Sequence, residues 1–183
     1  MPDDSAVTIW TIGHSTRTLD ELIAVLNVWQ IELVADVRRF PGSRRLPQFG
    51  AAPLESALGQ AGIAVQWIPA LGGRRRPRPD SVNSAWRVEG FRGYADHVES
   101  EEFAEGMFEL LTLAGGMRTA IMCAEFLWWR CHRRLISDVL VTVGIPVVHI
   151  RDEMASENHV IQAPARIVKG QLTYAADTQL TLV

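Results

Sequence analysis

The chain has 183 residues, 48% of them hydrophobic and 21% charged, which fits a single domain with its own core. Its net charge of −3 excludes a surface coated in basic charge for nucleic acid. No apolar run approaches the ~18 residues of a membrane helix, and residues 1–5 lack the basic and apolar regions of a secretory signal. We therefore expect a cytoplasmic protein that has no membrane contact.

Short apolar strands alternate with amphipathic helices along the chain. Strands are predicted at residues 7–12, 32–37, 64–71, 120–122 and 146–150. A capping box, Thr18 to Glu21, begins the first predicted helix, and further helices are predicted over 53–62, 100–115 and 135–143. Residues 159–174, with a turn at Lys169-Gly170, are expected to add a hairpin or an edge strand.

This alternation predicts an α/β fold in one compact domain over residues 1–183. Its sheet would be mainly parallel and flanked by helices, in a Rossmann-like or flavodoxin-like three-layer arrangement. Residues 72–93 are the one long irregular stretch, rich in Arg, Pro, Gly and Ser. A loop of that length is usually functional or disordered, and its aromatic residues favour order.

Polar or glycine residues follow every predicted strand. In an open parallel sheet, ligands bind outside the carboxyl ends of the strands, so these residues are expected to meet at one edge. In chain order they are His14 and Ser15, then Asp36 with Arg38 and Arg39, then Gly72 and Gly73, then Cys123 and Glu125, and finally His149, Arg151 and Asp152.

The segment 119–137 concentrates the chemistry of the chain, because it holds both cysteines, a carboxylate, an imidazole and several arginines. Cys131 precedes a predicted helix and adjoins His132, with Arg130 and Arg133 nearby. A helix N-terminus and adjacent cations lower a thiol pKa, so Cys131 is a candidate thiolate. Cys123, at a strand end, is a second candidate, and either thiol could attack while the other resolves; the alternative is a small buried hydrophobe.

Other kinds of site have weaker support. Cys123, Cys131 and His132 are eligible metal ligands, but there is no CxxC pair and their spacing matches none of the usual short zinc patterns. Six residues separate Cys123 from Arg130, and two tryptophans stand among them, which argues against a phosphatase loop. No Walker A or dinucleotide-binding glycine pattern is present, so ATP and NAD have no positive support, and the sequence leaves the cofactor open.

Arginine supplies seventeen of the eighteen basic residues, and several are clustered. Such clusters suit bidentate recognition of phosphate, whereas their alternative is solvated loop charge. The candidate ligand-binding residues are Ser15, Arg38, Arg74, Arg75, Arg76, Arg78 and Arg133.

Five segments of the chain resemble the domain-of-unknown-function family 488. They begin at residues 11, 33, 71, 91 and 122, and the similarity extends over about residues 8–175. One departure is Leu127-Trp128, where relatives often have a smaller residue and proline. The resemblance implies a compact α/β fold and a site around His14, Asp36, Arg38, Cys123, Glu125, Cys131, His132 and Arg133, without implying a reaction.

Three functions follow from these observations. The first is an enzyme with cysteine-dependent chemistry on a small anionic, phosphate-bearing substrate, with His132 or His14 as acid or base and Glu125 or Asp36 as orienting carboxylate. The second is a nucleic-acid-binding module that uses the arginine loops. The third is a metal-dependent hydrolase at the same edge of the sheet. The sequence leaves the substrate, the reaction and the oligomeric state open.

Overall fold

The computed structural model describes residues 7–42 and 44–176. Six strands form one sheet in the order β3-β2-β4-β1-β5-β6. The first five are parallel, and β6 pairs with β5 antiparallel. The bounds are Ile9–Gly13 (β1), Leu33–Asp36 (β2), Ala64–Trp67 (β3), Thr119–Cys123 (β4), Val147–Ile150 (β5) and Ser156–Asn158 (β6).

Two of the helices begin where a side chain accepts from a free backbone N–H group. Thr18 and Glu21 form the predicted capping box of α1 (Leu19–Val28), and Ser100 caps α4 (Glu101–Ala114). The other helices are α2 (Ala51–Gln60), α3 (Glu89–Val98) and α5 (Arg133–Thr142), and three short 3₁₀ segments are η1 (Pro47–Phe49), η2 (Pro69–Leu71) and η3 (Trp128–Arg130).

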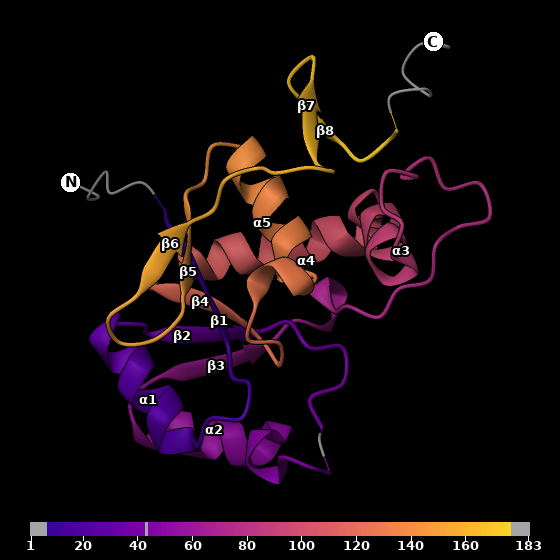
Figure 1. The fold of residues 1–183 in the computed structure, drawn as a ribbon. Helices are drawn as coiled ribbons and strands as arrows, with labels where there is room; N and C mark the ends of the chain where they lie inside the picture. The colour runs from indigo at the N-terminus through magenta and orange to yellow at the C-terminus, as the bar shows by residue number, and fades with distance from the viewer. Residues whose placement is uncertain (1–6, 43, 177–183) are drawn as a thin grey trace.

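The sheet has a helical layer on each face (Figure 1). One core packs α1 and α2 against the sheet and includes Ile12, Leu22 and Leu54. The other core packs α3, α4 and α5 against the opposite face and includes Tyr94, Leu110 and Leu135. Successive residues of β1 alternate between these cores, as the pleat of a strand requires. The predicted three-layer α/β fold is confirmed.

Three details differ from the expected elements. The third strand ends at Trp67 instead of residue 71, because Pro69 cannot donate a ladder hydrogen bond and begins η2. The irregular stretch 72–93 runs into α3, which was not predicted, and β6 is an additional edge strand.

The predicted C-terminal hairpin is present as β7 (Arg166–Val168) and β8 (Gln171–Thr173). Its turn residues Lys169 and Gly170 have φ angles of 52° and 80°, which a tight hairpin turn needs.

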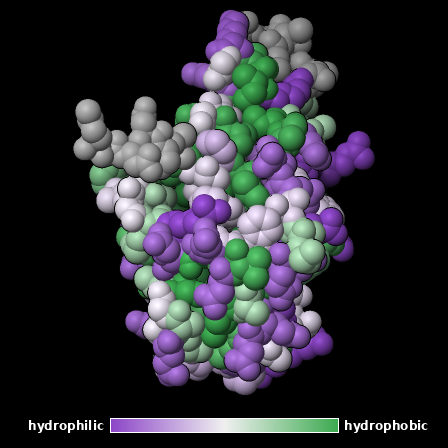
Figure 2. All heavy atoms as spheres, turned by 90° about the vertical axis from the view of Figure 1, so that its left-hand side faces the viewer, coloured by the Kyte–Doolittle hydropathy of each residue, from purple (hydrophilic) through white to green (hydrophobic). Residues whose placement is uncertain are grey.

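Hydrophobic side chains are interspersed with hydrophilic ones on the face turned to the viewer in Figure 2. None of the helices described here combines the length and the apolar character needed to span a bilayer.

Candidate functional site

The site lies at the carboxyl edge of the three central strands, β2, β4 and β1. Gly13 and Cys123 are partners in the β1–β4 register, and Asp36 is opposite Met122 in the β2–β4 register. Backbone pairing continues past the strand ends, because the His14 N–H donates to the Cys123 carbonyl at 2.9 Å. A Cβ at Gly13 would lie 1.9 Å from the Glu125 carbonyl oxygen. Only glycine at this position therefore allows the Cys loop, residues 123–132 between β4 and α5, to pass so closely.

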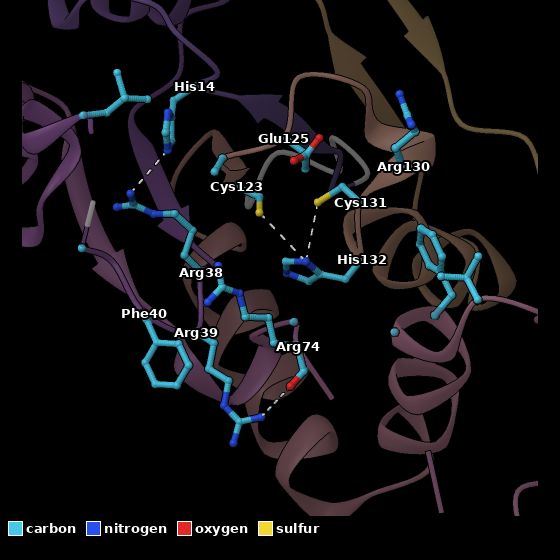
Figure 3. Close-up of a pocket in the computed structure, with 17 residues that line it drawn as sticks. His14, Arg38, Arg39, Phe40, Arg74, Cys123, Glu125, Arg130, Cys131 and His132 are labelled. Carbon is cyan, nitrogen blue, oxygen red and sulfur yellow. Dashed lines mark hydrogen bonds between the residues drawn. The ribbon is translucent and has the colours of Figure 1, made fainter. Parts of the chain in front are cut away.

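A pocket of about 470 Å³ opens at this edge (Figure 3). Its polar lining combines the end of β1, the segment after β2, the loop after η2 and the Cys loop. These residues are His14, Arg38, Arg39, Arg74, Cys123, Glu125, Arg130, Cys131 and His132. Its apolar lining is Phe40, Leu46, Val88 and Phe91. A mostly apolar cavity with a few convergent polar groups is the usual form of a small-molecule site.

Both sulfur atoms lie beside the His132 ring. Nδ1 of His132 is 3.5 Å from Sγ of Cys131 and 4.0 Å from Sγ of Cys123 (Figure 3). Nε2 of His132 is 3.0 Å from the Val37 carbonyl oxygen, which can only accept a hydrogen bond. Nε2 therefore carries hydrogen, and Nδ1 is left to interact with the two sulfurs. Both cysteines are free thiols.

The two thiols differ in acidity. Burial by itself raises the pKa of Cys131, but the hydrogen bond from the Cys123 thiol and the charges of His132 and Arg133 lower that pKa well below its usual value. The hydrogen bond to Cys131, together with burial, raises the pKa of Cys123 well above its usual value. Of the two thiols, Cys131 is therefore the more acidic, and Cys123 is the donor of the hydrogen bond between them.

The His132 ring is held between two neighbours. A Cβ at Gly73 would lie 2.7 Å from Nδ1, so the chain after η2 packs directly on the ring. The Tyr94 ring lies 5.0 Å from the His132 ring, and its hydroxyl donates to the Leu71 carbonyl at 2.7 Å. Packing on two sides fixes the imidazole opposite the sulfurs.

His14 forms a second polar group at the pocket wall, stacked on Phe49 with ring centroids 4.0 Å apart. Its Nδ1 donates to the Ser15 carbonyl at 2.9 Å, and Nε2 lies 3.4 Å from Nη1 of Arg38. Burial, with the Arg38 charge beside it, lowers the pKa of His14 to about 4. His14 is therefore neutral at pH 7 and presents an unprotonated Nε2.

Asp36 does not line the pocket, because its carboxylate is engaged behind Arg38. Arg38 donates from Nη2 to Oδ2 at 2.6 Å and from Nε to Oδ1 at 2.8 Å. Its Nη1 donates to the Phe49 carbonyl at 2.7 Å. Arg38 reaches the pocket as a guanidinium whose charge is already compensated.

Arg133 is also turned away from the pocket and is 1% exposed. Its guanidinium donates to the carbonyls of Glu125 and Phe126 and to Oγ1 of Thr11. It therefore holds the Cys loop from behind, which differs from the predicted contact with an anionic ligand.

A buried hydrogen-bonded chain leads from Arg133 to the C-terminal hairpin. Thr11 Oγ1 lies 2.7 Å from Nδ1 of His149, whose Nε2 lies 2.9 Å from Nδ1 of His159. Nε2 of His159 is 2.8 Å from Oδ1 of Asp138, and Tyr174 donates to Oδ2 at 3.0 Å.

The directions of the hydrogen bonds in this chain follow from its ends. A carboxylate has no hydrogen to donate, so Nε2 of His159 donates to Asp138, Nε2 of His149 donates to His159, and Thr11 donates to His149. Burial and the charges of His159 and Arg133 lower the pKa of His149 to about 2, which keeps its ring neutral. The chain thereby connects a buried cation to a buried carboxylate.

The expectation that all five strand ends supply one site is wrong for β5. Trp128 stacks on His149 with ring centroids 4.1 Å apart, and η3 thus separates His149 from the pocket. The Trp128 indole also donates to Glu157 at 2.9 Å, so the unusual residue of the Cys loop anchors it to β6. Arg151 and Asp152 are exposed beyond the strand.

The remaining predicted residues are divided between the pocket and its surroundings. The exposed Glu125 carboxylate lies on the same side of the pocket as the two sulfurs in Figure 3. Ser15 lies outside this pocket, in a neighbouring hollow that it shares with His14. Arg74 lines the pocket, whereas Arg75, Arg76 and Arg78 line the hollow next to it.

Sequence reasoning missed the apolar wall of the pocket. Phe40 is 65% exposed, although it directly follows the arginine pair at the end of β2. Val88 and Phe91 reach the pocket because they surround the start of α3, which was expected to be loop. The sequence did contain a signal for Phe40, because an apolar side chain next to clustered arginines at a strand end could have indicated a pocket wall.

Of the comparisons with known proteins, the one with family models found a match. No curated protein and no solved structure matches the chain. The family model described as "Domain of unknown function DUF488" matches residues 18–140, which include β2, β4 and the whole Cys loop. That match covers more than half of the chain, and the chain therefore belongs to the DUF488 family.

Proposed function

We propose that this protein is an enzyme that uses the Cys131 thiolate as a nucleophile on a small anionic substrate. The observation that carries the proposal is the Cys131–His132–Cys123 cluster at a pocket whose mouth holds arginines. A thiolate is the reactive form of cysteine, and the surrounding cations both stabilise it and attract an anion.

Each group at the pocket has a role in this proposal. The Cys131 sulfur supplies the electron pair for the bond to the electrophilic atom of the substrate, and the leaving group departs with the pair of the bond that breaks. The Cys123 thiol, whose pKa is raised, supplies a proton to that leaving group. In the second half of the reaction a water attacks the same atom, its proton returns to the Cys123 sulfur, and the bond to Cys131 breaks with its electron pair going back to that sulfur. The neutral His14, whose Nε2 lies 3.4 Å from Nη1 of Arg38, lines the opposite wall.

The anionic character of the substrate follows from the charges at the pocket mouth. Arg39, Arg74 and Arg130 line the pocket, and no ion pair joins any of them to a carboxylate within the described residues. Glu125 is the one carboxylate of the lining, so cationic groups outnumber anionic ones there.

A thiolate titration tests the proposal. Ultraviolet absorbance of the thiolate, followed against pH, is expected to show one group that titrates well below the ordinary thiol value of ~8.5. Cys131→Ser should abolish this transition. Cys123→Ser keeps a hydrogen-bond donor and should leave the midpoint low, whereas Cys123→Ala should raise it. Two thiols that both titrate at or above ~8.5 would refute the nucleophile.

A metal-dependent hydrolase is a second candidate, because the same three donor atoms lie within 4.8 Å of one another. Zinc bonds of about 2.3 Å to sulfur and 2.0–2.1 Å to nitrogen place tetrahedral S and N ligands about 3.5 Å apart. The separations from His132 Nδ1, 3.5 and 4.0 Å, are close to this value. Stoichiometric zinc in the purified protein, lost in both Cys131→Ser and Cys123→Ser, would favour the hydrolase over the nucleophile.

A further inference from the structure

The pocket at Cys131 continues into a second hollow of about 560 Å³. The two share Arg39, Phe40 and Arg74, so they adjoin and form one groove along these residues. In Figure 3, Arg39 and Arg74 lie side by side below the cysteines, and Nη1 of Arg39 is 3.4 Å from the Arg74 carbonyl oxygen. A ligand that starts at Cys131 can therefore extend past them.

The loop that forms the second hollow is fixed by packing on α3. A Cβ at Gly93 would lie 2.4 Å from the Arg75 carbonyl oxygen, so the helix and the loop are in direct backbone contact. The Arg78 N–H donates to one oxygen of Asp96 at 2.7 Å, and Ser81 and Asn83 donate to the other. The backbone that carries the arginines of this loop is thus fixed in place.

These arginines have two different roles. Arg75 makes a bidentate pair with Glu102, at 2.7 and 2.9 Å, and Arg78 pairs with Glu99 at 2.6 Å. Arg74 and Arg76 are exposed in the groove, and the described part of the chain gives neither of them a carboxylate partner. The carboxylates thus neutralise two of the four arginines and leave two available.

We propose that this second hollow is an anion subsite for a small substrate that carries two or more linked phosphates. One charged group would lie at the Cys131 pocket and the next against Arg74 and Arg76, with Arg39 between them. Guanidinium groups bind phosphate oxygens in a bidentate manner, and linked phosphates match cations spaced along a groove. The inference rests on the proposed function for the identity of the ligand as a substrate.

Calorimetric binding of inorganic phosphate and of tripolyphosphate tests the subsite. We expect tripolyphosphate to bind at least about ten-fold more tightly than phosphate, because it reaches both parts of the groove. Replacing Arg74 and Arg76 together by alanine should lower the affinity for tripolyphosphate by about ten-fold or more. Arg87→Ala, an exposed arginine outside both hollows, is the matched control and should change the affinity less than about two-fold.

Two results would overturn the subsite. One is an unchanged tripolyphosphate affinity in the double variant. The other is a single-stranded RNA that binds more tightly than tripolyphosphate and loses this binding in the same variant, which would make the groove a nucleic-acid interface. The thiolate is titrated without ligand and tripolyphosphate binding is measured by calorimetry, so a failed thiolate titration and a failed subsite are separate outcomes.

Discussion

Asp138 is the anionic end of the buried chain that begins at Arg133, and its replacement by asparagine should destabilise the protein strongly. Its two oxygens accept from His159 at 2.8 Å and from Tyr174 at 3.0 Å, and the residue is 0% exposed. Hydrogen bonds to a charged group contribute about 1.5–3 kcal/mol each, and a buried charge that loses its partner costs about 3–5 kcal/mol. The amide retains part of these contacts, so we expect a loss of about 3 kcal/mol.

The matched control is Tyr174→Phe, which removes one hydrogen bond to the same carboxylate without removing its charge. Its cost should be about 1 kcal/mol. Urea unfolding measures both, and with a slope of about 2 kcal/mol per molar the Asp138→Asn midpoint should fall by about 1.5 M. A shift no larger than that of Tyr174→Phe would refute a chain in which Asp138 balances Arg133.

Two further predictions concern histidines of the site. The pKa of His14 is lowered to about 4 and that of His149 to about 2, so the unfolded chain binds more protons than the folded one below pH ~6.5. As the pH falls from 6.5 to 5, the unfolding free energy should therefore decrease by up to ~1.4 kcal/mol per pH unit and group. His14→Gln should reduce this slope, and an unfolding free energy that does not change with pH would contradict these pKa values. Gly73→Ala would place a Cβ 2.7 Å from His132 Nδ1 and should raise the pH at which half of Cys131 is thiolate. The control is Gly90→Ala, which has open space around it in the same pocket and should leave that pH unchanged. Equal titration midpoints in the two variants would show that the His132 ring is free to move.

The main elements of the fold could be predicted from the sequence because their signals are local. The capping box at Thr18, the apolar strands and the Lys169-Gly170 turn each act over a few residues, and all are present. Helix α3 was missed because Gly90 and Gly93 lower its helical propensity and arginines and prolines precede it. Its glycine at 93 has a packing purpose, since it lets the helix approach the arginine loop.

The pocket residues His14, Cys123 and His132 could be predicted together because parallel strands end at one edge. The roles of Arg75 and Arg78 could not, because they depend on carboxylates 27 and 21 residues away in the sequence. Arg133 is linked through Thr11, His149 and His159 to Asp138, and these residues come from four separate parts of the chain. No spacing in the sequence indicates such a connection.

The arginines that are linked to a carboxylate fall into two groups. Arg38, Arg75 and Arg78 are paired directly with carboxylates. Arg133 carries its charge close to Cys131 and is linked to Asp138 only through a chain of hydrogen bonds. Within the described residues no carboxylate makes a direct ion pair with Arg133, so its charge remains effective at the sulfur. A carboxylate in direct contact with Arg133 would weaken that effect, so the indirect link to Asp138 favours the Cys131 thiolate.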